Sequence, residues 1–223
     1  VLSGKSFFVV FCALMRKGDI LEDLLVETMA GEGKCVSSLE GKVVFLEGGA
    51  PGDRGGAQVT KIKSSFLEAR VTRIRELSPN RAEPFCVHFG LCGGCSWQHI
   101  QYDTQLVYKQ KQVVDNLERL GGLQLPYISP IISSEKTRFY RNKLDYTFSA
   151  QRWLTKEELH SSEGKGQGEV ALGYHIPRKY DLVFNVKECH LQPDPSNAMR
   201  LAVRDEAIRN NIPFFDLRKQ IGF

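Results

Sequence analysis

The sequence predicts an α+β fold, in which a small closed β-barrel comes first and a domain of mixed helices and strands follows. Three observations support this prediction. Five short strand-like segments with Gly- and Pro-containing turns lie between residues 20 and 77, alternating strand and helix patterns follow, and three closely spaced cysteines lie between the two parts. With 223 residues, 42% of them hydrophobic, the chain can form a substantial core.

The first 18 residues give no basis for a structural prediction. Phe7 to Met15 form an apolar run of nine residues, whereas a membrane-spanning helix needs roughly 20. No small-residue cleavage site follows, as a signal peptide would require. The chain begins with Val, so we expect a fragment, a non-standard start or translated upstream sequence.

The barrel is predicted within residues 19–80. Its strand-like stretches read ILEDLLVETM, GKCVSSL, GKVVFLEG, AQVTKIK and FLEARVTRIREL, and SPNRAEP forms a linker to the cysteines. Residues 81–223 form the predicted second domain. There Asp103 to Leu120 and Ser196 to Asn210 have helical patterns, while KLDYTFS, ALGYHI and DLVFNVKEC have strand patterns. PFFDLRKQIGF predicts the start of another strand, so we expect a domain truncated at its C-terminal end.

Charge is unevenly distributed, although the net charge is only +4. Residues 57–81 carry six basic and two acidic residues, and residues 136–152 carry five basic residues and one acidic residue. Basic stripes of this kind attract polyanions such as nucleic acid. The competing interpretation is an ordinary solvated surface.

Cys86, Cys92 and Cys95 indicate a metal site. A chain of this size with a full core has little need of disulfides. A structural zinc site normally uses two close pairs of ligands, whereas three cysteines from one loop with a distant fourth are typical of an iron–sulfur cluster. Cys189 is the natural fourth ligand, and Gly93 and Gly94 allow the backbone to approach the sulfides. Both metals stay open at this point, and the cluster is favoured.

The same residues resemble a known family. EPFCVHFGLCGGCSWQHIQYDTQLVYKQ resembles the cluster motif of the bacterial RNA uracil-5-methyltransferases of the 23S rRNA type. GEGKCVSSLEGKVVFLEGGAPGD resembles that family's N-terminal TRAM domain, an OB-like RNA-binding barrel, and FYRNKLDYTFS with ALGYHIPRKYDLVFNVKECHLQP resembles its central domain. The resemblance covers roughly residues 19–223.

The resemblance implies specific ligands and cofactors. It assigns a 4Fe-4S cluster to Cys86, Cys92, Cys95 and Cys189, and S-adenosylmethionine to the full-length enzyme. The family's Rossmann-like methyltransferase domain, with its cysteine nucleophile and acidic base, is expected to be missing from this chain. No catalytic residue is therefore predicted here, and the chain is expected to be inactive alone.

The sequence departs from the family pattern after PGD, where Arg54-Gly55-Gly56 replaces an apolar strand start. This predicts a weakened barrel edge. No zinc-protease motif, P-loop or Ser-His-Asp set is visible in the sequence.

RNA is the expected partner, ribosomal RNA being favoured over transfer RNA. Phe66 and Trp97 are candidates for stacking on bases. The predicted RNA-binding residues are basic and lie in both domains: Lys61, Lys63, Arg70, Arg73, Arg141, Lys143 and Arg178. We expect a cytoplasmic monomer with no membrane partner. The alternative is a stand-alone iron–sulfur or zinc module that binds RNA without methyl transfer.

Overall fold

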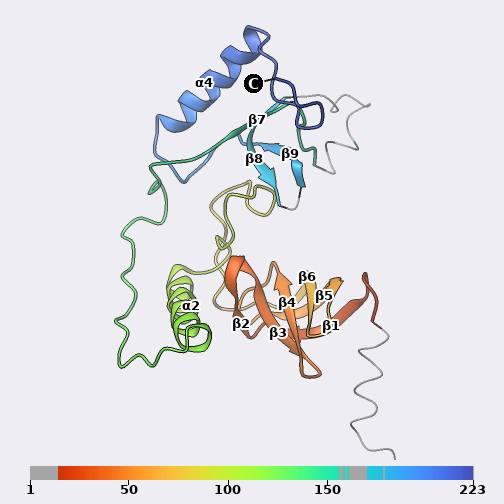
Figure 1. Ribbon diagram of the computed structural model, residues 1–223, viewed down its shortest axis with the longest axis vertical. Coiled ribbons are helices and arrows are strands. Elements are labelled where there is room, and N and C mark those ends of the chain that lie inside the picture. The colour runs from red at the N-terminus through yellow and green to blue at the C-terminus, as the bar shows by residue number, and fades with distance from the viewer. Residues whose placement is uncertain (1–14, 156–157, 159, 161–169, 178, 223) are drawn as a thin grey trace, which may run out of the picture. The chain divides into compact units, whose positions relative to one another are not determined.

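A computed structural model describes residues 15–155, 158, 160, 170–177 and 179–222 (Figure 1). The chain divides into two compact units, each made of two separate stretches of the sequence. The first unit comprises the chain up to Glu83 together with His99–Ser133, and the second comprises Pro84–Gln98 together with the chain from Ser134 onward. The loop Ser162 to Glu169 and most of the segment 1–18 lie outside the described residues.

The first unit is built on one six-stranded sheet. Its strands are β1 (Ile20–Leu25), β2 (Thr28–Met29), β3 (Cys35–Leu39), β4 (Lys42–Glu47), β5 (Arg54–Ile62) and β6 (Phe66–Glu76), with a 3₁₀ turn η1 (Gly31–Gly33) between β2 and β3. The spatial order is β1-β5-β6-β4-β3-β2. The β4–β6 pair is parallel and the other pairs are antiparallel.

Alternation along the strands creates the core of this sheet. In β4 and β6 the side chains of Val44, Leu46, Leu67 and Ala69 are buried, while the residues between them face outward. Ten buried residues from β1, β3, β4, β5, β6 and the residue after β1 form one hydrophobic cluster. Cys35 belongs to this cluster, and burial raises the pKa of its thiol to about 12, which fits a structural role.

Gly55 shows why the departure after PGD is tolerated. β5 begins at Arg54, so the strand starts at the position where an apolar residue was expected. A Cβ on Gly55 would lie 2.1 Å from the carbonyl oxygen of Arg73, and register shifts occur on both sides of this glycine. The glycine therefore permits close approach of β6 at a bulge. Arg54 is exposed, whereas Gly55 and Gly56 are buried in a strand that lies between β1 and β6.

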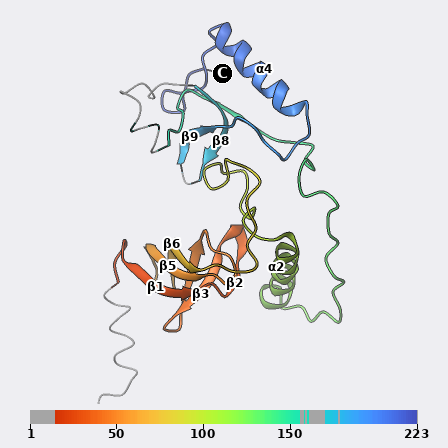
Figure 2. The ribbon, with the colours of Figure 1, turned by 180° about the vertical axis from the view of Figure 1, so that it is seen from behind.

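A helix follows the sheet in this unit. α2 (Tyr102–Asp115) continues as a π-helical turn, η2 (Asn116–Leu120), so the helix predicted for Asp103 to Leu120 is present. Both views place α2 beside the β2 edge of the sheet (Figures 1 and 2). None of its residues is buried, which shows that the apolar face seen in the sequence is only partly covered among the described residues.

The second unit contains a three-stranded antiparallel sheet and a helix. The strands β7 (Thr147–Ser149), β8 (Ala171–Ile176) and β9 (Lys179–Asn185) lie in this order, and α4 (Ser196–Arg209) follows. The fold is therefore mixed α+β, as the sequence predicts. The final strand predicted from PFFDLRKQIGF is wrong, since this stretch forms only an isolated bridge between Asp216 and Ile221.

Candidate functional site

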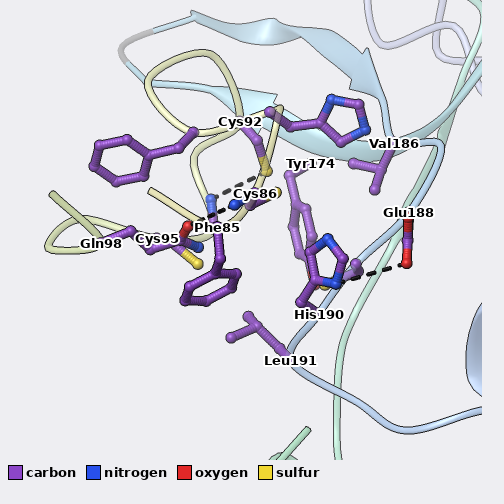
Figure 3. Close-up of a pocket in the computed structure, with 14 residues that line it drawn as sticks. Phe85, Cys86, Cys92, Cys95, Gln98, Tyr174, Val186, Glu188, His190 and Leu191 are labelled. Carbon is purple, nitrogen blue, oxygen red and sulfur yellow. Dashed lines mark hydrogen bonds and ion pairs between the residues drawn. The ribbon is translucent and has the colours of Figure 1, made fainter. Parts of the chain in front are cut away.

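A pocket in the second unit gathers the four cysteines that the sequence singled out. Cys86, Cys92, Cys95 and Cys189 all line it, and its volume is about 370 Å³ with the adjoining open solvent included (Figure 3). Three of them belong to the loop Pro84–Gln98, and the fourth follows β9. Residues about ninety positions apart in the sequence therefore meet at one cavity.

Local hydrogen bonds fix the loop that carries three of the cysteines. The Phe89 N–H donates to the carbonyl of Cys86 at 3.0 Å, and the Cys92 N–H donates to the carbonyl of His88 at 2.9 Å. The side-chain oxygen of Gln98 accepts from the Cys86 N–H at 3.2 Å. The first two bonds form turns, and the third joins the start of the loop to its end.

Two glycines let this loop pack tightly. A Cβ on Gly93 would lie 2.6 Å from the carbonyl oxygen of His175 in β8, a distance that real Cβ atoms do not adopt. The Gly94 N–H donates to the Cys92 sulfur at 3.4 Å. Glycine at these positions therefore brings the loop against β8 and supplies an N–H group to a sulfur.

Cys189 is held by one side chain of α4. Its N–H donates to Asn197 Oδ1 at 2.9 Å, and Asn197 Nδ2 donates to the carbonyl oxygen of Cys189 at 3.0 Å. The two bonds fix the peptide groups on both sides of the cysteine. The backbone of Cys189 is thereby fixed where the residue lines the pocket.

Burial governs the electrostatics of the thiols. It raises the pKa of Cys92 to about 11, an effect that the Gly94 N–H only partly offsets. Burial also raises the pKa of Cys95, again with a smaller opposing effect from a hydrogen bond, here with Gln98. The Cys92 and Cys95 thiols are therefore protonated at neutral pH, and a bound metal would have to displace their protons.

The described side chains form no site for a single metal ion. Among the described residues, no group of three or more His, Cys, Asp or Glu side chains is arranged to hold one metal ion. A zinc ion needs its thiolates about 2.3 Å from a common centre. The four cysteines line one pocket without being arranged around such a common centre.

Two histidines, His88 and His190, line the same pocket. His88 is 8% exposed, accepts the Lys187 N–H at 3.3 Å and packs edge-on against Phe184. Burial lowers the pKa of His88, and the nearby Lys187 adds to the effect. His190 packs edge-on against Phe85 and Phe139. These contacts describe packing roles.

The basic residues predicted on the first unit lie on exposed positions of β5 and β6 or just after β5. Lys61 pairs with Glu68 at 3.5 Å, and Arg70 pairs with Glu47 at 3.3 Å. Within the part of the chain that the structure describes, the side chains of Lys63 and Arg73 form no ion pair. The charges of these two side chains are therefore available to pair with an anionic ligand.

An aromatic pair lies on the same outward face. Phe45 and Phe66 are half-buried, and their ring centroids are 5.4 Å apart in an edge-to-face arrangement. Phe66 alternates with the buried Leu67, and Phe45 is opposite Glu68 in the β4–β6 register. This face therefore combines partly exposed rings with basic side chains.

In the second unit the predicted basic residues are less concentrated. Arg141 and Lys143 are exposed, and Lys143 pairs with Asp145 at 3.4 Å. Arg178 lies outside the described residues.

Residues 21–72, within the six-stranded sheet of the first unit, match the family model of the TRAM domain. The chain is also similar along most of its length to proteins named RNA methyltransferase. One, from Bacteroides thetaiotaomicron, is 47% identical over 194 residues, which cover 87% of this chain and 42% of that protein. Another, from Porphyromonas gingivalis, is 44% identical over 88% of this chain and 43% of that protein.

This chain spans less than half the length of these relatives. A solved structure, the Pyrococcus abyssi tRNA (uracil-54, C5)-methyltransferase in complex with S-adenosyl-L-homocysteine, matches 90% of this chain and 40% of that chain with a TM-score of 0.54. At 21% identity this likeness concerns the fold alone.

The prediction of a missing Rossmann-like methyltransferase domain is wrong as a statement of fold class. The relatives match 87% of this chain, and a methyltransferase structure matches 90% of it, so the comparisons give no support for a missing domain or for an inactive chain. The fold class is mixed α+β with two sheets. None of the described helices is long and apolar enough to cross a membrane.

Sequence reasoning missed the side chains that surround Cys189. Asn197 and Arg200 lie three residues apart on α4 and both contact the segment Val186 to Cys189. Tyr146 and Tyr174 bury their hydroxyls beside it. Burial and the adjacent Cys189 thiol raise the pKa of Tyr146 to about 12. Nothing in the local sequence marks these residues, because the fold alone brings them to the cysteine.

Proposed function

We propose that this chain is the RNA-binding, cluster-bearing part of an S-adenosylmethionine-dependent RNA uracil-5-methyltransferase. The TRAM match and the relatives named RNA methyltransferase support this proposal. The whole enzyme would place a methyl group on C5 of a uridine, with ribosomal RNA favoured over transfer RNA. No residue of this chain is assigned to S-adenosylmethionine or to a step of methyl transfer.

The proposed metal group is a 4Fe-4S cluster on Cys86, Cys92, Cys95 and Cys189. The observation that carries this proposal is the single pocket that all four cysteines line. The donor set fits, since four thiolates are the ordinary ligands of such clusters. The Gly94 N–H aimed at the Cys92 sulfur fits as well, because N–H groups stabilise anionic sulfur. The cluster would contribute its binding free energy to the folded state of the second unit.

Iron and acid-labile sulfide in anaerobically purified chain test this proposal. About four irons and four sulfides per chain, with broad absorption near 400 nm, are the expected result. Cys189→Ser should lose or degrade the cluster, whereas Cys35→Ser, which alters a cysteine buried in the other unit, should retain it. Zinc without sulfide would contradict the proposal and favour the zinc module. Iron retained in full by Cys189→Ser would remove that residue from the ligand set.

The proposed RNA surface is the outward face of β4, β5 and β6. Lys63 and Arg73 supply charge, Lys61 and Arg70 supply charge shared with acidic partners, and Phe66 supplies a ring for an unpaired base. Stacking of a base on an aromatic ring contributes about 1–3 kcal/mol. The proposed contacts in the domain 19–80 are the barrel residues named above. In the domain 81–223 they are Arg141, Lys143 and Arg178. A cytoplasmic location follows from this function.

Binding of uridine-containing stem-loops from ribosomal and transfer RNA, measured by fluorescence anisotropy at several salt concentrations, tests the surface. Arg73→Gln should reduce the slope of log affinity against log salt by about 0.7 for a single-stranded site. Phe66→Ala should weaken binding by about 5- to 150-fold without changing this slope. Arg54→Gln is the matched control, because Asp23 already neutralises that arginine. Equal effects of Arg73→Gln and Arg54→Gln would contradict the proposed surface.

A further inference from the structure

Arg200 is a buried cation in the second unit. It lies on α4 and is only 7% exposed. Its Nη1 donates to the carbonyl oxygen of Val186 at 2.5 Å, and its Nη2 donates to the carbonyl oxygen of Lys187 at 2.9 Å. Both acceptors belong to the short segment that leads to Cys189. The guanidinium therefore contacts the backbone of the segment that leads to Cys189, the fourth cysteine.

No carboxylate compensates this charge in the part of the chain that the structure describes. None of the ion pairs among those residues includes Arg200, and its Nε is buried without a hydrogen-bond partner. The guanidinium carbon lies 5.0 Å from the centroid of the Tyr146 ring, which offers only a weak cation–π attraction. A buried cation without a counter-ion is costly, so its presence needs a source of negative charge nearby.

The cysteine pocket is that source when thiolates and sulfides occupy it. Val186, whose carbonyl accepts from Arg200, lines the pocket together with Cys189. Asn197 joins the two features, because its Oδ1 accepts from both the Cys189 N–H at 2.9 Å and Arg200 Nη2 at 3.3 Å. The chain Arg200, Asn197 and Cys189 thus connects the buried charge to the ligand by hydrogen bonds.

We propose that Arg200 is a positioning residue of the cluster, which holds the Val186 to Cys189 segment and offsets the negative charge of the four-thiolate centre. This inference rests on the cluster proposed above. Two effects follow. Hydrogen bonds from the guanidinium fix the ligand segment, and its positive charge favours the more negative, reduced form of the cluster. Net charge and hydrogen bonding near the sulfurs are known determinants of cluster potential.

Substitutions at Arg200 separate the two effects. Arg200→Gln removes the charge and keeps some hydrogen bonding, whereas Arg200→Lys keeps the charge with fewer donors. Arg204→Gln is the matched control, since Arg204 lies one turn further along α4 and pairs with Asp205 at 2.7 Å. Circular dichroism of all three variants establishes that each is folded.

The midpoint potential of the cluster, measured by anaerobic redox titration, is the readout. In Arg200→Gln we expect the ratio of reduced to oxidised cluster at a fixed potential to fall about tenfold, the size expected for loss of one buried charge. For one electron this equals a shift of about 59 mV to more negative potential. Arg200→Lys and Arg204→Gln should remain close to the unsubstituted chain.

Two outcomes would overturn the inference. Equal potentials in Arg200→Gln and the unsubstituted chain would show that the charge does not act on the cluster, and so would a shift in Arg204→Gln as large as that in Arg200→Gln. Failure of the underlying proposal looks different, because the unsubstituted chain would then contain no iron and sulfide at all. The metal assay therefore precedes the titration.

Discussion

Asp53→Asn should destabilise the first unit strongly, because Asp53 is a buried carboxylate with several partners. Its side chain is 2% exposed and pairs with Arg81 at 2.8 Å. It also accepts the N–H groups of Ala50 at 2.6 Å and Ser78 at 3.0 Å. The carboxylate therefore joins the turn before β5 to the segment after β6. An amide can accept at only one of its two atoms, so at least one of these donors would lose its partner.

The size of the stability loss depends on how deeply the ion pair is buried and on how well water can solvate Arg81 once Asp53 is replaced. Breaking a buried ion pair by removing one partner typically costs about 3–5 kcal/mol. Since the Arg81 side chain is 21% exposed, water can partly solvate it after the substitution, and we expect a loss near the lower limit, about 3 kcal/mol. For a unit of this size such a loss lowers the melting temperature by about 12–24 °C.

Urea and thermal unfolding of Asp53→Asn, Arg81→Gln and the double variant measure this effect. The double variant should be less destabilised than the sum of the two single variants, because it leaves no unpaired charge. Asp23→Asn is the matched control. Asp23 also forms a two-bond pair with Arg54, but it is 47% exposed, so only a small change is expected. A loss from Asp53→Asn as small as that from Asp23→Asn would refute the reasoning.

The same pair predicts a dependence on pH. Burial alone would raise the pKa of Asp53, but hydrogen bonds from Arg81, Ser78 and Ala50 outweigh it and hold the pKa below the ordinary value of 3.8. The folded state therefore binds the proton less readily than the unfolded state. The contribution of Asp53 is fully present well above pH 3.8 and is lost as the pH falls below 3.8 toward the folded pKa. Asp53→Asn should reduce this acid sensitivity.

Three further outcomes are expected. Burial lowers the pKa of His99 below 6.5, so unfolding free energy should fall as the pH drops below 6.5, and His99→Gln should flatten this dependence between pH 5 and 8. Gly93→Ala should reduce the iron content of the chain, because a Cβ there meets the His175 carbonyl at 2.6 Å, whereas Gly94→Ala, with contacts of 3.4 Å or more, should retain it. Cys35→Ala should lower the unfolding free energy by about 1 kcal/mol in a urea titration, through a lost buried contact.

Strand and helix patterns in the sequence were sufficient to place most elements. Strand-like stretches between turns predicted β4, β6 and β8, and helical patterns predicted α2 and α4. Alternation predicted a strand over KLDYTFS, of which only β7 (Thr147–Ser149) forms. The π-helical end of α2 and the bulges around Gly55 depend on contacts with other strands. The final strand failed because apolar Phe214 and Phe215 indicate burial without specifying a partner strand. Phe214 instead packs against Phe148.

The candidate site was only partly visible in the sequence. The spacing of Cys86, Cys92 and Cys95 marked the loop, since such spacing is rare without a metal. Arg200 could not be found, because an arginine in a charged helix is normally a surface residue. Its burial depends on how α4 packs against the segment before Cys189, and only the structure contains that information.

The stretches of the two units alternate along the sequence, and this order has a consequence for synthesis. The cysteine loop belongs to the second unit, yet it is made before residues 99–133, which complete the first unit. During translation the loop therefore leaves the ribosome well before Cys189 does. The rest of the second unit is not yet made when both segments of the first unit are available to fold together. Neither unit can be expressed as one uninterrupted stretch of the chain. Attempts to produce either unit alone need a short designed linker in place of the segment that belongs to the other.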